Sequence, residues 1–286
     1  MQLLPSQIFN GIGLGLVYFL IAVGMTLIVG IMGIVNFTHG AFVLLGCYFS
    51  YQIVQIAHSF WYALLLAPLL VGGMAFIVER VLLSRLYGAS HLDQILATLG
   101  LSIIIVELVI ACWGEYALPV GVPPALSGAA VLWSDFSYPR YRLFLLAFSS
   151  VTALTLWLAL ERTTYGAIIR AGSQSKTMVE LLGVNIGLLY SATFALGAAL
   201  AGLAGVLFAP LRGASTSVAL EALGISFVIV VLGGMGNFTG ALLGALLVGL
   251  TQSITSAYYP AVSEAMIYVS MAVVLLLRPH GLLGRS

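Results

Sequence analysis

The sequence predicts an all-α fold, a polytopic transmembrane helical bundle of about eight or nine spans, from three observations. Hydrophobic residues make up 62% of the 286 residues and charged residues only 7%, whereas soluble domains carry roughly 25% charged residues. Many apolar runs reach the ~20 residues that an α-helix needs to cross a bilayer. These runs do not alternate in polarity, as strands of a membrane β-barrel do. Because a soluble core of this size could not hide so much apolar surface, residues 1–286 are predicted to form a single transmembrane domain in the lipid bilayer.

Nine apolar segments follow one another along the chain. They lie at about residues 8–35, 41–57, 61–83, 94–113, 141–160, 188–209, 219–232, 241–258 and 263–277. The first is longer than one straight span requires and contains Gly11-x-x-x-Gly15, whose small residues let helix backbones approach closely. Pro210 is expected to end the sixth segment. Simple counting puts the N-terminus outside the cell, and a broken or re-entrant segment would change the count to eight or ten and move it inside.

Residues 114–140 interrupt the apolar pattern. This stretch contains Pro119, Pro123, Pro124 and Pro139, together with Trp133. Proline disfavours continuous helix, and aromatic side chains favour the membrane interface. We therefore expect an external loop with a short helix on the membrane surface.

Basic residues orient the chain, since cytoplasmic loops carry an excess of Lys and Arg. If residues 114–140 are external, seven basic residues become cytoplasmic: Arg80, Arg85, Arg162, Arg170, Lys176, Arg278 and Arg285. Arg140 and Arg142 oppose this orientation, but they are outnumbered. The C-terminus is therefore predicted to be cytoplasmic.

Charge is concentrated in one internal loop, at about residues 161–187. Glu161, Arg162, Arg170, Lys176 and Glu180 lie in it, five of the 19 charged residues of the chain (10 basic plus 9 acidic). A membrane protein that gathers its charge in one cytoplasmic loop presents a docking surface there. The net charge of +1 gives no reason to expect a nucleic-acid partner.

Two stretches of the sequence resemble each other and suggest an internal repeat. Residues 27–46 and 228–247 both place an apolar run before a glycine-rich turn, an Asn-Phe-Thr triplet and a second apolar run. Transporters are often built from internal repeats with polar sites where helices break. The alternative is that the glycines serve packing alone and that the similarity is chance in a sequence of low complexity. Even in a true repeat, the triplets could serve only to cap helices.

Polar residues within or beside apolar runs are the candidates for a solute pathway. They are Asn36, Thr38, His39, Glu107, Asn237 and Thr239. Glu107 stands in the middle of an apolar run, where a carboxylate is costly and therefore a candidate for function. It could equally be protonated or bonded to a neighbouring helix. No second ligand is spaced to complete a metal site with His39.

Motifs of known enzymes are absent from the sequence. There is no G-x-x-x-x-G-K-[ST] phosphate-binding loop, since the single lysine, Lys176, follows Gln174-Ser175. Neither H-E-x-x-H nor G-x-S-x-G occurs. The chain is therefore not expected to be an enzyme, to bind a cofactor of its own or to hydrolyse ATP.

Three motifs together resemble the LivH-type family, the inner-membrane permeases of bacterial branched-chain amino acid ABC importers. Residues 30–40 are similar to the family signature G-x-x-N-F-A-H-G, residues 165–185 to its cytoplasmic ATPase-contacting loop, and residues 230–245 to its later glycine-rich segment. The resemblance covers nearly the whole chain. It departs at Ala41, where many members carry an acidic residue, which weakens the transfer of substrate identity.

The resemblance implies a function and a set of partners. Such a permease pairs with a second, related permease. Two cytoplasmic ABC ATPase subunits, which bind ATP and magnesium, drive the pair, and a periplasmic solute-binding protein delivers the solute. The residues that match the coupling-loop pattern are Tyr165, Gly166, Arg170, Gly172, Lys176, Glu180 and Gly183.

The function expected from this resemblance is passage of branched-chain or other hydrophobic amino acids across the bacterial inner membrane. A permease for urea or short-chain amides is the alternative within the same class. A self-standing secondary transporter or channel would need coupling carboxylates within the spans, and Glu107 is the single central candidate.

Overall fold

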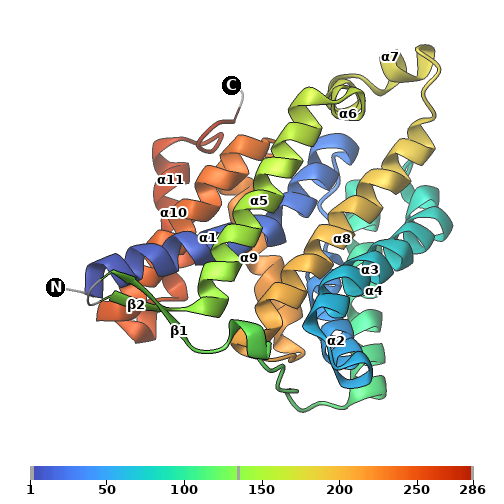
Figure 1. Cartoon of the computed structure of the whole chain (residues 1–286). Helices are drawn as coiled ribbons and strands as arrows, with labels where there is room; N and C mark the ends of the chain where they lie inside the picture. The colour runs from blue at the N-terminus through green and yellow to red at the C-terminus, as the bar shows by residue number, and fades with distance from the viewer. Residues whose placement is uncertain (1–2, 134–135, 285–286) are drawn as a thin grey trace.

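The computed structural model describes residues 3–133 and 136–284, which are almost entirely helical (Figure 1). The α-helices are α1 (Leu3–Met32), α2 (His39–Ala57), α3 (Phe60–Val81), α4 (His91–Trp113), α5 (Arg140–Arg162), α6 (Thr164–Gln174), α7 (Lys176–Leu181), α8 (Ile186–Arg212), α9 (Ser217–Gly233), α10 (Phe238–Tyr258) and α11 (Ala265–Leu277). Short 3-10 turns are η1 (Leu83–Leu86), η2 (Pro124–Leu126) and η3 (Pro260–Val262), and the strands are β1 (Ala129–Trp133) and β2 (Phe136–Pro139).

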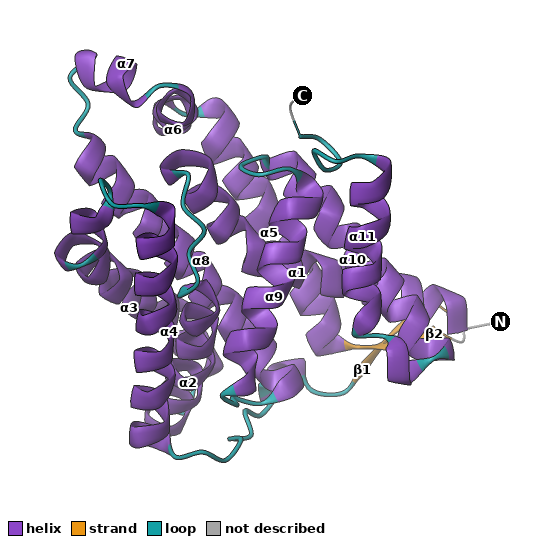
Figure 2. Ribbon diagram, turned by 180° about the vertical axis from the view of Figure 1, so that it is seen from behind, coloured by secondary structure: helices purple, strands orange, loops and turns teal. Residues whose placement is uncertain are grey.

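The helices confirm the transmembrane bundle. Seven of them are long and apolar enough to cross a membrane, and α9 and α11 are shorter apolar helices. Together they give nine apolar helices in the described chain, in line with the nine segments expected. In both views α6, α7 and the C-terminal end of the chain lie at one end of the bundle, and the β1–β2 hairpin lies at the other (Figures 1 and 2). These ends are called the coupling end and the hairpin end below.

Helix α1 is continuous, although its length suggested a break. Its 30 residues correspond to about 45 Å, more than the ~30 Å hydrocarbon thickness of a bilayer. A span of this length fits by tilting, and Figure 1 shows α1 running obliquely to α5.

Helices α1, α2 and α8 form the centre of the bundle through close backbone contacts. Phe42 of α2 packs edge to face on Phe194 of α8, with ring centroids 5.8 Å apart. A Cβ atom on Gly46 would lie only 2.2 Å from the carbonyl oxygen of Gly202. Small residues therefore set the distance between these helices.

Helices α3, α4 and α5 surround this centre and leave large apolar side chains exposed. Leu69, Ile103 and Leu154 are 62%, 56% and 57% exposed on the isolated chain. Exposed apolar faces on these three helices are what a lipid bilayer or a second membrane subunit would cover.

The hairpin end differs from the expectations in two ways. The proline-rich stretch contains the short 3-10 turn η2 and also a two-stranded antiparallel hairpin, β1–β2, which was not expected. The backbone of Leu118 also pairs with that of Ala214. Helix α8 does not end at Pro210 but continues to Arg212, because one missing N–H in the last turn does not interrupt the bonds that follow it.

A C-terminal segment, residues 278–284, packs across the α9–α10 turn. The Leu282 N–H donates to the carbonyl oxygen of Leu232 at 2.8 Å. The Asn237 side-chain amide donates to the carbonyl oxygen of Leu283 at 2.8 Å. These bonds fix the end of the described chain at the coupling end of the bundle.

Candidate coupling site and polar turns

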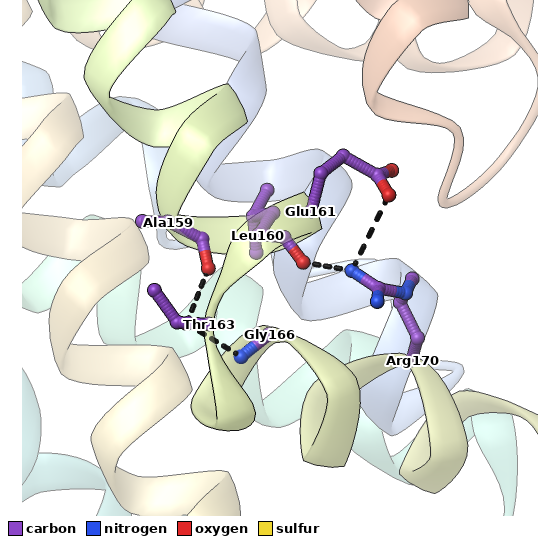
Figure 3. A network of polar contacts seen from close by, with 6 residues as sticks. All are labelled: Ala159, Leu160, Glu161, Thr163, Gly166 and Arg170. Carbon is purple, nitrogen blue, oxygen red and sulfur yellow. Dashed lines mark hydrogen bonds and ion pairs between the residues drawn. The ribbon is translucent and has the colours of Figure 1, made fainter.

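Helices α6 and α7 project from the coupling end of the bundle, beyond α5 and α8 (Figures 1 and 2). Thr163 starts α6 as its N-cap, since its hydroxyl oxygen accepts the Gly166 N–H at 3.2 Å. The same hydroxyl donates to the carbonyl oxygen of Ala159, in the last turn of α5 (Figure 3). One side chain therefore ends α5 and begins α6 across a sharp turn.

Arg170 braces α6 against the end of α5. Its guanidinium donates to the carbonyl oxygen of Leu160 and lies 3.6 Å from the Glu161 carboxylate (Figure 3). The carbonyl belongs to the last helical turn, which lacks intrahelical donors. Arg170 thus binds within this chain, where the sequence alone suggested contact with a partner.

Gly166 is required for the close approach of α6 to α5. A Cβ atom at this position would lie 2.1 Å from the Leu160 carbonyl oxygen and 2.6 Å from its Cα atom. Both neighbours are backbone atoms of a regular helix, so they cannot move as a side chain could. Any residue larger than glycine displaces α6.

Helix α7 carries an exposed apolar surface on a buried anchor. Val179 is 2% exposed, whereas Met178, Leu181 and Leu182 are 60%, 80% and 75% exposed. The chain leaves α7 through Gly183, whose φ of +83° lies in the left-handed region that favours glycine. We define Met178, Leu181 and Leu182 as the α7 tip.

The α7 tip was not among the residues predicted for the site. The residues predicted for the site are mostly charged residues and glycines, whereas the three residues of the α7 tip are apolar residues of types that are common throughout the sequence. Positions 178, 181 and 182 follow the i, i+3, i+4 spacing that places residues on one face of a helix, and this spacing was the signal that could have identified them.

The remaining predicted loop residues occupy different positions around this pair of helices. Tyr165 is 80% exposed, and Glu180 is exposed on α7. Gly172 is buried and faces the Leu189 side chain at the start of α8. The side chain of Lys176 lies outside the described part of the chain.

The first Asn-Phe-Thr turn, residues 36–38, is buried between α1 and α4. The Thr38 hydroxyl donates to the carbonyl oxygen of Thr98 at 2.7 Å, and the Asn36 side-chain oxygen accepts the Thr38 N–H at 3.0 Å. Nε2 of His39 lies 2.7 Å from the carbonyl oxygen of Ile21. The Asn36 amide nitrogen and His39 Nδ1 are buried with no hydrogen-bond partner in the described residues.

The second triplet has different surroundings. Asn237 caps α10 by accepting the Gly240 N–H at 2.9 Å, and its nitrogen binds the C-terminal segment. Thr239 is exposed. Helix α10 starts directly after Asn237, whereas α2 starts three residues after Asn36, so the two turns share a sequence pattern but differ in geometry.

The structure does not gather the six pathway candidates around one cavity. Glu107 lies on the exposed face of α4, away from the buried first triplet. Among the described residues no group of three or more His, Cys, Asp or Glu side chains could hold a metal ion.

This arrangement defines a class: a multi-pass membrane protein in which a pair of short helices, α6 and α7, projects from one end of the bundle. The chain belongs to the family described as branched-chain amino acid transport system / permease component, whose profile matches residues 7–277. The family resemblance is therefore confirmed, and the family is one of transport permeases.

Several relatives match along most of their length. The high-affinity branched-chain amino acid transport system permease protein LivH of Escherichia coli strain K12 is 30% identical, over 98% of this chain and 95% of its own. The corresponding protein BraD of Pseudomonas aeruginosa is 29% identical over the same shares. LivM of E. coli K12 is 26% identical, over 94% of this chain and 68% of its own. No solved structure matches the chain.

Proposed function

We propose that this chain is the membrane-spanning permease subunit of an ABC importer that passes branched-chain or other hydrophobic amino acids across the inner membrane. In this proposal separate ATPase subunits bind ATP and magnesium and dock on α6 and α7. A second, related permease completes the membrane pair, and a periplasmic binding protein delivers the solute. The C-terminus lies in the cytoplasm with the coupling end.

The exposed α7 tip is the observation that carries this proposal. Leucine side chains that are 75–80% exposed on a projecting helix outside the apolar bundle favour a protein partner over lipid. The brace of Arg170 and the tight contact at Gly166 hold α6 rigidly on α5, so a push on the pair would reach the membrane helices. The sequence lacks a phosphate-binding loop of its own, which agrees with an external source of ATP hydrolysis.

The relatives support the pairing of two permeases. Two different E. coli relatives, LivH and LivM, carry the name of the same high-affinity branched-chain amino acid transport system. A pair of related permeases is therefore the expected arrangement. No specific observation favours the urea or amide alternative.

Removing the α7 tip tests the docking proposal. Burial of a leucine contributes about 1.5–3 kcal/mol, and the exposed fractions of Leu181 and Leu182 reduce this to about 1–2 kcal/mol each. Joint replacement of Leu181 and Leu182 by alanine should weaken ATPase binding by about 2–4 kcal/mol, or about 30- to 1,000-fold. Tyr116→Ala, which removes an 88% exposed side chain between α4 and β1, is the control. Titration of ATPase subunits onto the permease pair in nanodiscs measures the change, and unchanged affinity would contradict docking at α7.

Uptake by the reconstituted complex tests the solute. Proteoliposomes that contain both permeases and both ATPases, with the binding protein outside, should accumulate labelled leucine when ATP is enclosed. Labelled urea and acetamide should not accumulate. Uptake of either amide without leucine would reverse the order of the two alternatives.

A further inference from the structure

A cavity of about 510 Å³ lies at the hairpin end of the bundle. Helices α6 and α7 lie at the opposite end (Figures 1 and 2). Its walls come from the first half of α1, from β2, from the start of α5 and from the ends of α8 and α10. Ligand cavities for small molecules commonly enclose about 300–1,000 Å³, so the space is sufficient for an amino acid and some water. None of the six predicted pathway residues lines it.

One wall presents a buried hydrogen-bond donor. The Tyr18 hydroxyl donates to the side-chain oxygen of Gln252 at 2.7 Å, and these residues are 0% and 6% exposed. Because this bond uses the amide oxygen, the Gln252 nitrogen is left as the donor. It makes no hydrogen bond among the described residues, and Gln252 lines the cavity.

A second donor group is held in place beside it. The Asn10 side-chain oxygen accepts from the Tyr138 hydroxyl at 2.7 Å and from the Arg142 guanidinium. Burial raises the pKa of Tyr138 above its ordinary value, which keeps its hydroxyl protonated as a donor to Asn10. Asn10 is neutral, so it orients Arg142 without cancelling its positive charge.

The cavity also contains charges of both signs. Arg212 is paired with Glu221 at 3.3 Å and lies over the Phe208 ring at 5.8 Å. Glu264, from the turn before α11, lines the cavity and forms no ion pair within residues 3–133 and 136–284. Arg142 and Glu264 are thus one cation and one anion that form no ion pair among the described residues, and they lie on different walls.

An apolar part of the lining completes the cavity. It consists of Leu14, Val17, Leu145, Phe208 and Leu211, with Gly13, while Gln7, Ser253, Ser256 and Ser263 add uncharged polar groups. A ligand with a carboxylate, an ammonium group and an apolar side chain matches the charged and apolar parts of this lining.

We propose that this cavity receives the transported amino acid. The carboxylate binds the Gln252 amide nitrogen and Arg142, the ammonium group binds Glu264, and the aliphatic side chain packs on Leu145 and Phe208. The inference rests on the proposed transport function and names the site for it. Urea or a short amide has neither charge and would form neither of these ion pairs.

Protection of an introduced cysteine tests this site in the complete complex in proteoliposomes. Ser256 lines the cavity and is exposed, so Ser256→Cys should react with a membrane-impermeant thiol reagent. The exposed Cys112 is first replaced by serine, while Cys47 is buried and stays. Tyr116→Cys in the same background is the control that reacts irrespective of ligand.

Leucine should protect Ser256→Cys and leave Tyr116→Cys reactive. Leucinamide lacks the carboxylate and 4-methylpentanoate lacks the ammonium group, so each should need at least a tenfold higher concentration. Glu264→Gln should remove the preference for leucine over 4-methylpentanoate, while Glu115→Gln, outside the cavity, should keep it. Labelling without protection, or no labelling, would overturn the site.

Uptake of labelled leucine by the unmodified complex separates the two proposals. Uptake without protection of Ser256→Cys would leave the transport function standing and place the solute elsewhere. Absence of leucine uptake, with labelled Ser256→Cys unprotected, would contradict the function itself.

Discussion

Replacing Gly166 by alanine tests whether α6 must sit tightly on α5 for energy coupling. The added Cβ atom would lie 2.1 Å from the carbonyl oxygen of Leu160 and 2.5 Å from its carbonyl carbon. Neither backbone atom can move without breaking the end of α5, so α6 must shift outward. Alanine favours helix over glycine by about 1 kcal/mol, so a loss of function could not be attributed to helix propensity.

The magnitude follows from the cost of overpacking. Extra methyl groups in tightly packed sites cost about 1–3 kcal/mol. If only the docked position of α6 couples to the ATPase, this cost lowers the population of the coupled state by about 5- to 150-fold. We therefore expect Gly166→Ala to reduce solute-stimulated ATP hydrolysis by at least fivefold, with the membrane bundle intact.

The assay compares ATP hydrolysis by the reconstituted complex with and without loaded binding protein. Gly88→Ala is the matched control, because Gly88 has open space around it and an ordinary φ, in the turn between η1 and α4. Size-exclusion profiles and the amount of assembled complex show whether folding is preserved. If Gly166→Ala couples as well as Gly88→Ala, the contact between α5 and α6 does not transmit the signal.

Two further changes test the packing described above. Asn237→Ala removes the cap on the Gly240 N–H and the bond to Leu283, so the unfolding free energy should fall by about 1–3 kcal/mol. Thermal unfolding of the purified protein in detergent measures the fall. An unchanged unfolding midpoint would show that Asn237 does not hold the C-terminal segment. Gly46→Ala places a Cβ atom 2.2 Å from a carbonyl oxygen of α8 and should strongly reduce the amount of folded protein in the membrane. Gly73→Ala is the control, because a Cβ atom there has nothing within 4 Å, and it should not reduce that amount. Equal amounts of both variants would contradict close packing of α2 on α8.

The number and placement of the membrane helices could be predicted from the sequence because lipid imposes a simple rule. A backbone that crosses hydrocarbon must satisfy its own hydrogen bonds, so long apolar runs become helices. The rule says less about water-exposed segments. The hairpin at 129–139 is fixed by pairing between two short strands, and its prolines gave no sign of that register.

The charged loop could be located from the sequence, but the contacts of its residues could not. Clustered charge identified the loop, yet Arg170 binds Leu160 and Glu161 within the chain. Whether a charged side chain faces a partner or its own helix depends on the turn at Thr163, which determines the direction of α6. The α7 tip was not predicted because apolar residues are common in this sequence, and a short i, i+3, i+4 pattern is easily missed among longer apolar runs.

The cavity at the hairpin end could not be predicted, because its lining comes from five separated parts of the chain. Arg142 appeared in the sequence only as an exception to the charge rule, and Gln252 as one polar residue near the end of an apolar run. Their meaning depends on which residues the fold brings beside them, namely Asn10 for Arg142 and Tyr18 for Gln252.

Two helices connect the proposed docking and binding sites and suggest how they communicate. Helix α5 carries Arg142 at one end and the Leu160 carbonyl that contacts Gly166 at the other, about 27 Å apart at 1.5 Å per residue. Helix α8 likewise starts beside α7 and ends at Arg212 on the cavity wall. If both proposals hold, a shift of α6 and α7 moves two packed helices as rigid rods, and the cavity changes shape because two of its walls are the far ends of those rods. A rigid connection of this kind requires no chain of polar residues through the bundle, which is consistent with the scattered positions of Asn36, Glu107 and Asn237.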